Sequence, residues 1–333
     1  MVDSAGPFLV PARASNVFIL ASAEYIPARI VDNAYFSELT GRPTEWFEKL
    51  TGIRQRHRAA SDENANTMAL AAVATLLRES PDALQGVDLI IGASYTPWDT
   101  IGTMAHEIQK HFNVHNARAL FVSTACSSFI DALEIVAAYF QSGRSTRALV
   151  VAVEHNSLYS KDSDDKSGHL WGDGAAALVI SREPGGHDIE ILEVEAVGRA
   201  DIGRGPEAIR MVPHQDGLVM HYGKDIFNHA CREMVAAAQH ILDRQHIPLV
   251  DVRLLIPHQA NKRIIDCVIE HLKLPEERLA MTIAELGNTG CASVAITYHR
   301  NWQRLRAGQV GMLVTFGGGY SAGAALLRKR TPD

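Results

Sequence analysis

The stretch Ser123-Thr124-Ala125-Cys126-Ser127-Ser128-Phe129 is the part of the sequence from which the fold can be read. An apolar run, Ala119 to Val122, precedes it, and a segment that is apolar nearly all round follows from Ile130 to Phe140. This pattern predicts a buried strand, a tight turn of small residues and a buried helix with Cys126 at its N-terminus. Unpaired N–H groups and the positive end of the helix dipole favour a thiolate there, so Cys126 is a candidate nucleophile. The alternative is a small buried cysteine that only fills the turn.

Apolar runs typical of strands buried on both faces recur on either side of this stretch, and helical patterns alternate with them. The runs are Val87 to Gly92, Ala148 to Val153, Ala177 to Ile180, Asp251 to Ile256 and Val310 to Phe316. Alternation of this kind predicts an α/β protein.

Three landmarks of the first half of the chain recur in the second half at nearly one spacing. The pairs are Asp88 and Asp251, Cys126 and Gly290, and Gly143 and Gly308, with offsets of 163, 164 and 165 residues. This indicates a duplication, with halves at 1–184 and 185–333 that pack about a pseudo-twofold axis. The strand-end loops of the two halves then converge, and ligands bind at such loops in open α/β sheets.

The composition bounds the class of protein. The 333 residues are 47% hydrophobic and 21% charged, as in an ordinary globular protein, and the net charge of −6 argues against nucleic acid as a partner. The four cysteines lie far apart with no CxxC pair, which argues against a zinc site or a disulfide framework and for a reducing compartment. With no leader pattern and no apolar stretch of about 18 residues, we expect a cytoplasmic enzyme and no membrane partner.

Three further loops fall at strand ends or helix starts. They are Pro257-His258-Gln259-Ala260-Asn261, Gly287-Asn288-Thr289-Gly290 and Phe316-Gly317-Gly318-Gly319. Taken singly, His258 would be a structural histidine, Asn288 an N-cap and the glycines a plain turn. Their coincidence with Cys126 at the landmark positions favours one reactive site. The arginines of Thr51 to His57, taken alone, would form a solvated basic loop or salt bridges.

These motifs resemble the β-ketoacyl-acyl-carrier-protein synthase III family of thiolase-fold condensing enzymes. The matching stretches are S-T-A-C-S-S, P-H-Q-A-N-K-R-I, G-N-T-G-C-A-S, W-G-D-G-A and F-G-G-G, with T-E-W-F-E-K-L-T-G-I-R-Q-R-H near the N-terminus. The resemblance runs from about Ile19 to Leu327. It implies a thiolase-like fold in which the two α/β halves form five layers, αβαβα, and it implies a homodimer.

The resemblance also implies roles for the site residues. Cys126 would take an acyl group from a thioester, with its own N–H and that of Gly318 as the oxyanion hole. His258 and Asn288 would donate to the thioester oxygen of the second substrate, whose Cα then attacks the acyl carbonyl. The turn Trp171 to Ala175 would be structural. No metal and no bound cofactor are implied, because both substrates arrive on the phosphopantetheine of coenzyme A or of an acyl carrier protein.

The resemblance also implies substrate-binding roles for individual residues of this chain. Trp46, Arg54 and Lys166 would hold the phosphopantetheine arm, and Lys224 would be a further phosphopantetheine or substrate-binding residue. Ile101, or its neighbour Thr100, would stand where an aromatic residue closes the acyl pocket across the dimer interface, so a longer acyl chain would fit.

Other positions bear on the carrier. Lys262 and Arg263 would form the basic surface that docks the acidic carrier protein. Family members primed by coenzyme A usually have an arginine at the position of Leu50, an arginine near Asp165 and an asparagine at the position of Lys224. Because these side chains are absent here, most of the usual contacts with the nucleotide of coenzyme A would be lost.

The sequence therefore predicts an acyltransferase that performs a Claisen condensation between an acyl group on Cys126 and a malonyl or β-ketoacyl thioester on an acyl carrier protein. The pathway would be polyketide or specialised fatty acid synthesis, with possible joining of two chains into a pyrone or another ring. The alternative is initiation of fatty acid synthesis from acyl-coenzyme A and malonyl carrier protein. A papain-like hydrolase conflicts with the duplication and with the buried helix after Cys126. A scaffold without activity conflicts with the presence of Cys126.

Overall fold

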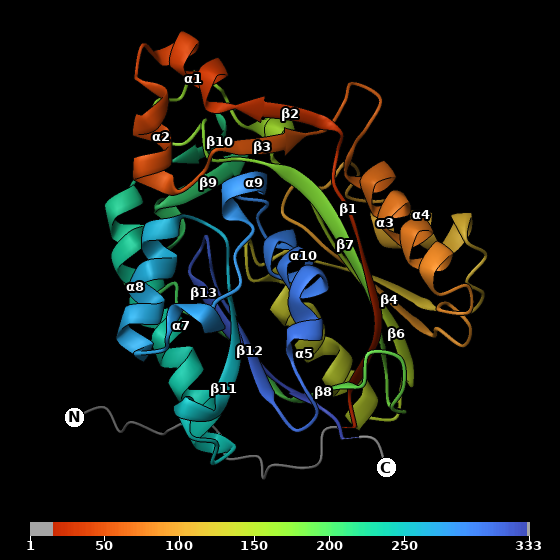
Figure 1. Cartoon of the computed structure of the whole chain (residues 1–333). Coiled ribbons are helices and arrows are strands. Elements are labelled where there is room, and N and C mark those ends of the chain that lie inside the picture. Colours follow the sequence, from red (N-terminus) through yellow and green to blue (C-terminus); the bar gives the residue numbers. More distant parts are fainter. Residues whose placement is uncertain (1–15, 332–333) are drawn as a thin grey trace.

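The computed structural model describes residues 16–331 and has the α/β alternation that the sequence predicts (Figure 1). The strands are β1 (Phe18–Tyr25), β2 (Arg29–Asp32), β3 (Gln55–Arg58), β4 (Leu89–Ala93), β5 (Arg118–Val122), β6 (Arg147–His155), β7 (Asp173–Ser181), β8 (Ile189–Gly198), β9 (Ile209–Val212), β10 (Gly217–Met220), β11 (Val252–Pro257), β12 (Val310–Gly317) and β13 (Ser321–Lys329). The helices are α1 (Asn33–Thr40), α2 (Thr44–Thr51), α3 (Ala65–Glu79), α4 (Met104–His111), α5 (Ser128–Gln141), α6 (Asn156–Tyr159), α7 (Gly223–Arg244), α8 (Lys262–Leu272), α9 (Ile283–Leu286) and α10 (Ala292–Asn301).

The main sheet consists of two runs of strands with the same connectivity. Its order is β11-β12-β13-β8-β1-β7-β6-β4-β5. In the first run β4 lies parallel to β6, and β6, β7 and β1 are antiparallel neighbours. In the second run β11 lies parallel to β12, and β12, β13 and β8 are antiparallel neighbours. This repeat explains the recurring landmarks of the sequence. The boundary at residue 184 falls between β7 and β8 and stays a prediction.

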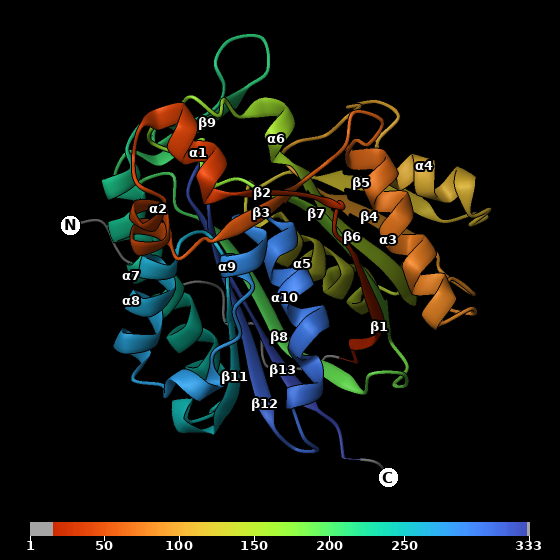
Figure 2. The ribbon, with the colours of Figure 1, turned by 45° about the horizontal axis from the view of Figure 1, so that its top comes forward.

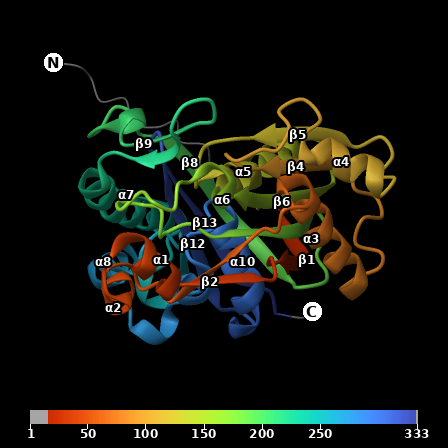
Figure 3. The ribbon, with the colours of Figure 1, turned by 90° about the horizontal axis from the view of Figure 1, so that it is seen from above.

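The layers follow the order expected, and Figures 2 and 3 show them from two further sides. Helices α5 and α10 lie at the centre of the molecule. Helix α5 packs against β4, β5 and β6 on one side and against β8 and β13 on the other, and α10 packs against β1 and β7 and against β11 and β12. Helices α3 and α4 cover the outer face of the first run, whereas α7 covers β12 and β13 and packs on α8. The fold is therefore the predicted five-layer αβαβα arrangement.

The two central helices bury most of their side chains because they lie between two sheets. In α5 the side chains of Phe129, Leu133 and Val136 are fully buried, and in α10 those of Val294 and Ile296 are. Within residues 16–331, no helix combines the length and the apolar character that a bilayer span requires.

Two expectations are wrong. The stretch Thr51 to His57 is not simply a solvated loop, because part of it forms β3 and Arg56 is completely buried. The Arg56 guanidinium donates to the carbonyl oxygens of Val31 and His169 and to Asn33 Oδ1. Burial and the nearby Arg58 charge lower the pKa of Arg56 to about 9.

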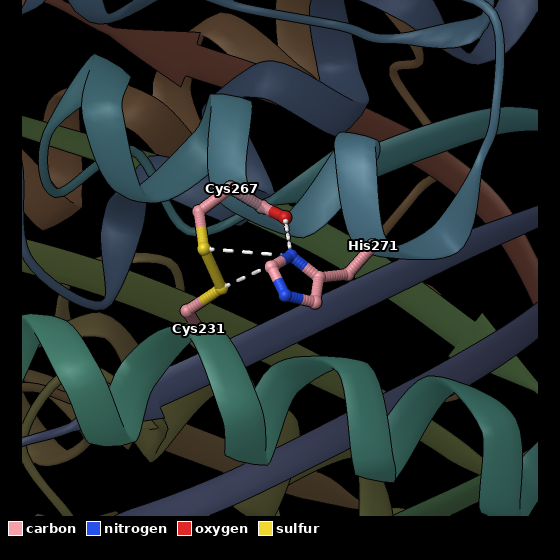
Figure 4. The surroundings of a disulfide bond; sticks show 3 residues. All are labelled: Cys231, Cys267 and His271. Carbon is pink, nitrogen blue, oxygen red and sulfur yellow. Dashed lines mark hydrogen bonds between the residues drawn. A yellow bond between two sulfur atoms is a disulfide. The ribbon is translucent and has the colours of Figure 1, made fainter.

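The second correction concerns the cysteines. Cys231 on α7 and Cys267 on α8 form a disulfide (Figure 4), although no disulfide was expected. The sequence hides this pair because its members are 36 residues apart and meet only when the two helices pack side by side. The cysteine pattern therefore no longer supports a reducing compartment.

Candidate active site

Cys126 lies on a tight turn between β5 and α5. The preceding residue, Ala125, has a φ of 52°, in the left-handed region that non-glycine residues seldom adopt. The Thr124 N–H donates to Ser128 Oγ at 2.9 Å, and this hydroxyl donates to the Ala125 carbonyl at 2.6 Å. A Cβ on Gly317 would lie 2.7 Å from the Cys126 nitrogen, so only glycine permits β12 to end so close to this turn. The backbone thus fixes the position of Cys126.

The structure brings Cys126, His258 and Asn288 to one narrow cavity of about 40 Å³, which Gly318 also lines. These four residues come from different segments. Cys126 lies on the turn after β5 and His258 at the end of β11. Asn288 lies on the turn after α9 and Gly318 at the end of β12. The predicted convergence of strand-end loops is thus confirmed for these residues. A wider cavity of about 390 Å³ begins on the other side of Cys126 and Gly318. Its further lining comes from Tyr95, Ser123 and the β9–β10 hairpin, including Ile209, Met211 and Leu218.

A serine contacts one nitrogen of His258 and favours the other as the donor into the narrow cavity. His258 Nδ1 lies 2.8 Å from Ser293 Oγ, and this oxygen accepts the Gln259 N–H at 3.2 Å. Because no other acceptor in the described part of the chain contacts the Ser293 hydroxyl, the arrangement that pairs its proton has Ser293 donating to Nδ1, and this favours the tautomer with the His258 proton on Nε2. Burial lowers the pKa of His258 to about 4, so the ring is neutral at pH 7.

Asn288 is held in a similar way. Its Oδ1 accepts the Gly290 N–H at 2.9 Å, so Nδ2 is left as the donor. Its backbone N–H donates to Leu170 O at 2.8 Å, and its carbonyl accepts the Gly172 N–H at 3.0 Å. A Cβ on Gly172 would lie 2.0 Å from Leu286 O, so the turn Trp171 to Ala175 needs glycine there. That turn serves as a support for Asn288.

Cys126 differs from the expectation of a resting thiolate. Burial, followed by the charge of Glu154, raises the pKa of Cys126 to about 12. Hydrogen bonds from the N–H groups of Gly318 and of Cys126 itself to the sulfur act in the opposite direction. Desolvation outweighs the effect of the helix N-terminus because only 8% of Cys126 is exposed. Cys126 is therefore a thiol before substrate binds.

Sequence reasoning missed Glu154, which is fully buried at the end of β6. Its carboxylate accepts the N–H groups of Thr96 at 3.2 Å, Tyr95 at 3.3 Å and Cys291 at 3.4 Å. Burial raises the pKa of Glu154 to about 7 in spite of these donors. A single acidic residue directly after the apolar run Ala148 to Val153 was the signal that could have identified it.

Two predicted substrate-binding residues of the N-terminal region lie outside both cavities. Trp46 packs edge-on against Phe47, and the Arg42 guanidinium stands 4.3 Å over its ring. Arg54 forms a long ion pair with Glu48 at 3.9 Å.

The remaining predicted residues are at the surface. Ile101 is 87% exposed, and Lys224 is exposed in the first turn of α7. Lys262 pairs with Asp266 at 2.7 Å, and Arg263 lies 5.8 Å from the ring of Phe227. Lys262 and Arg54 line one surface cavity of about 250 Å³. The roles proposed for these six residues stay predictions.

Known proteins resemble this chain over nearly its whole length. A family model described as 3-oxoacyl-[acyl-carrier-protein (ACP)] synthase III matches residues 122–198, and the model of its C-terminal part matches residues 242–329. A β-ketoacyl-[acyl-carrier-protein] synthase III of Methylococcus capsulatus is 35% identical over 93% of this chain and 98% of its own.

Two solved structures share the fold at 30% sequence identity. The 3-oxoacyl-[acyl-carrier-protein] synthase III of Aquifex aeolicus matches with a TM-score of 0.87 over 94% of this chain and 99% of that one. A priming β-ketosynthase from a polyketide biosynthetic pathway matches with a TM-score of 0.86 over 98% of this chain and 100% of that one.

Proposed function

Because this chain belongs to the β-ketoacyl-[acyl-carrier-protein] synthase III family of acyl-transferring condensing enzymes, we propose that it joins an acyl group held on Cys126 to a second thioester on an acyl carrier protein. The second thioester is malonyl or β-ketoacyl. The observation that carries this proposal is the single cavity lined by Cys126, His258 and Asn288. A nucleophile and two hydrogen-bond donors at one point are what two-step acyl transfer with carbon–carbon bond formation requires.

In the first step the Cys126 sulfur attacks the carbonyl carbon of the incoming thioester. The C–S bond to the carrier breaks, and the Cys126 proton leaves with the released carrier thiol. The N–H groups of Cys126 and Gly318 both act to lower the pKa of the sulfur, so both are near the carbonyl carbon that becomes tetrahedral. They are the donors expected to stabilise its oxyanion.

In the second step His258 Nε2–H and Asn288 Nδ2–H donate to the thioester oxygen of the second substrate. This stabilises the enolate that forms when carbon dioxide or a proton leaves its Cα. The Cα then attacks the acyl carbonyl, and Cys126 departs as a thiolate that regains a proton. Because His258 is neutral at pH 7, it acts as a donor without placing a positive charge beside the thiol.

Three observations support a specialised pathway with carrier-bound substrates, in polyketide or unusual fatty acid synthesis. The chain has Leu50, Asp165 and Lys224 where family members primed by coenzyme A usually have, at or near these positions, arginine, arginine and asparagine. A cavity of about 390 Å³ adjoins Cys126. The priming β-ketosynthase of a polyketide pathway is among the similar structures. The alternative is initiation of fatty acid synthesis from acyl-coenzyme A, and the similar curated proteins carry only the general name β-ketoacyl-[acyl-carrier-protein] synthase III.

The test is to weigh the intact protein after incubation with acetyl-coenzyme A and, separately, with a long-chain acyl carrier protein. We expect the acyl mass from the carrier protein on the peptide that contains Cys126, and no such adduct on Cys126→Ser. Cys291→Ser removes the other free cysteine and should still be acylated. An adduct from acetyl-coenzyme A alone would favour the initiation enzyme, and no adduct from either donor would overturn the proposal.

A further inference from the structure

Helices α7 and α8 carry a cluster of metal-ligating side chains that the proposed reaction does not use. Cys267 and His271 are four residues apart on α8, so both lie on one face of that helix, and Cys231 meets them from α7 (Figure 4). The two sulfur atoms and a ring nitrogen all lie within 4.8 Å of one another. Two cysteines and one histidine form a set that Zn²⁺ prefers.

The imidazole already stands at ligand distances from both sulfurs. His271 Nδ1 is 3.6 Å from Cys267 Sγ and 3.9 Å from Cys231 Sγ. In a tetrahedral zinc site with Zn–S of about 2.3 Å and Zn–N of about 2.0 Å, a nitrogen and a sulfur ligand are about 3.5 Å apart. To make room for the ion the two sulfurs must separate, which breaking the bond between them permits, and His271 Nδ1 must turn toward them from the Cys267 carbonyl oxygen, which it contacts at 2.8 Å.

We propose that Cys231, Cys267 and His271 form a redox-gated site for one thiophilic divalent cation of the Zn²⁺ type. In the oxidised protein the sulfurs bind each other and the site is closed. A dithiol reductant supplies two electrons and two protons, itself becomes a disulfide, and leaves two thiols. The cation then displaces both thiol protons. The His271 proton, which on Nδ1 bonds to Cys267 O at 2.8 Å, moves to Nε2 so that Nδ1 can bind the ion.

The residues around the cluster leave it accessible to a cation from solvent. His271 is exposed and Cys267 half-buried, and a cavity of about 470 Å³ adjoins the cluster. The polar residues Asn228 and Gln239 line that cavity, and a water molecule from it is the expected fourth ligand. Arg232 lines it too, but its guanidinium bonds to Glu233 at 2.9 Å, which offsets the positive charge.

The test uses the full chain and Co²⁺ as the probe, because a tetrahedral thiolate site gives Co²⁺ strong visible bands. The protein is reduced with a dithiol, freed of reductant without oxygen and titrated. We expect one equivalent of Co²⁺ to bind in tetrahedral geometry and Zn²⁺ to displace it, whereas the oxidised protein binds none. His271→Ala should still form the disulfide but bind more than about ten-fold more weakly, since even second-shell losses cost that much.

The double variant Cys231→Ser/Cys267→Ser keeps Cys126 and Cys291 and should show no tetrahedral cobalt spectrum. His240→Ala removes a histidine of α7 that lines a different cavity and should bind like the wild type. Equal binding by the double variant, equal binding by the oxidised protein, or no tetrahedral spectrum in the reduced protein would each overturn the proposal. The last result would leave the pair as a structural crosslink only.

Discussion

Ser293 determines the donor direction of His258, and this gives a first prediction. Ser293→Ala removes the hydroxyl that bonds to Nδ1, so both tautomers of the neutral ring become accessible. We expect the kcat of condensation to fall by roughly ten-fold, with little change in KM and in the rate at which Cys126 is acylated.

Ser293→Thr serves as the matched control, because it keeps the hydroxyl and should retain most of the activity. Single-turnover acylation and steady-state condensation separate the two steps. An equal loss in both steps, or in both variants, would contradict a role through the tautomer.

Glu154 adds to the effect of burial on the ionisation of Cys126, which gives a second prediction. A carboxylate charge near the thiol disfavours the thiolate, and Glu154 itself ionises at a pKa of about 7. Glu154→Gln removes this charge, so the pKa of Cys126 falls. We expect the pH profile of Cys126 alkylation by iodoacetamide to move to lower pH by roughly one unit.

Glu134→Gln is the control for this experiment, because Glu134 is another carboxyl group whose pKa burial raises, to about 6, on α5. It should leave the alkylation profile unchanged. Mass spectrometry of the peptides distinguishes Cys126 from Cys291. A profile that stays in place in Glu154→Gln would show that burial alone suppresses the thiolate.

At the scale of elements, the β9–β10 hairpin contributes side chains to both cavities. Ile209 lines both, and its Cγ2 would lie 2.7 Å from a Cβ on Gly318. Ile209→Ala should open a passage beside Cys126 and favour long acyl chains over acetyl by about ten-fold in the rate of acylation. Competition between short and long acyl carrier proteins measures this ratio. Val219→Ala, on the same hairpin but outside both linings, should leave it unchanged.

The elements also show how far sequence reasoning reaches. The strands around Cys126 and the duplication were predictable, because buried strands give continuous apolar runs and the landmarks repeat. The β9–β10 hairpin was not, because strands of four residues are too short to show a period. The burial of Arg56 depends on acceptors from Val31, Asn33 and His169, which only the tertiary fold brings together.

In the site, too, residues whose role depends on tertiary contacts could not be predicted from the sequence. The position of His258 and Asn288 beside Cys126 was predictable because each follows a recognisable strand or turn. Glu154 and Ser293 were not identified, since their importance lies in contacts with residues 34 or more positions away. The pKa of Cys126 was misjudged because a helix end is visible in a sequence, whereas the loss of water around a side chain is not.

For the whole molecule, the proposed homodimer gives a further prediction. Strand β5 is an edge of the main sheet with half-buried apolar side chains, and exposed edges of this kind invite pairing. Ile101 belongs to the same half and is 87% exposed. Ile101→Asp should therefore weaken the dimer, seen as a shift toward monomer in sedimentation velocity. Val250→Asp changes another exposed apolar residue, in the second half, and should not. Identical sedimentation of both variants and the wild type would place the interface elsewhere.

The position of β1 has a consequence for synthesis on the ribosome. This strand begins the described chain, yet it lies between β7 and β8, with Phe18 opposite both Ser181 and Glu190. It leaves the exit tunnel long before either neighbour exists. Such a segment must stay unpaired, or sheltered by a chaperone, until more than half of the polypeptide has been translated. Codon changes that slow elongation before residue 190 would prolong the exposure of this apolar strand and should lower the yield of native enzyme.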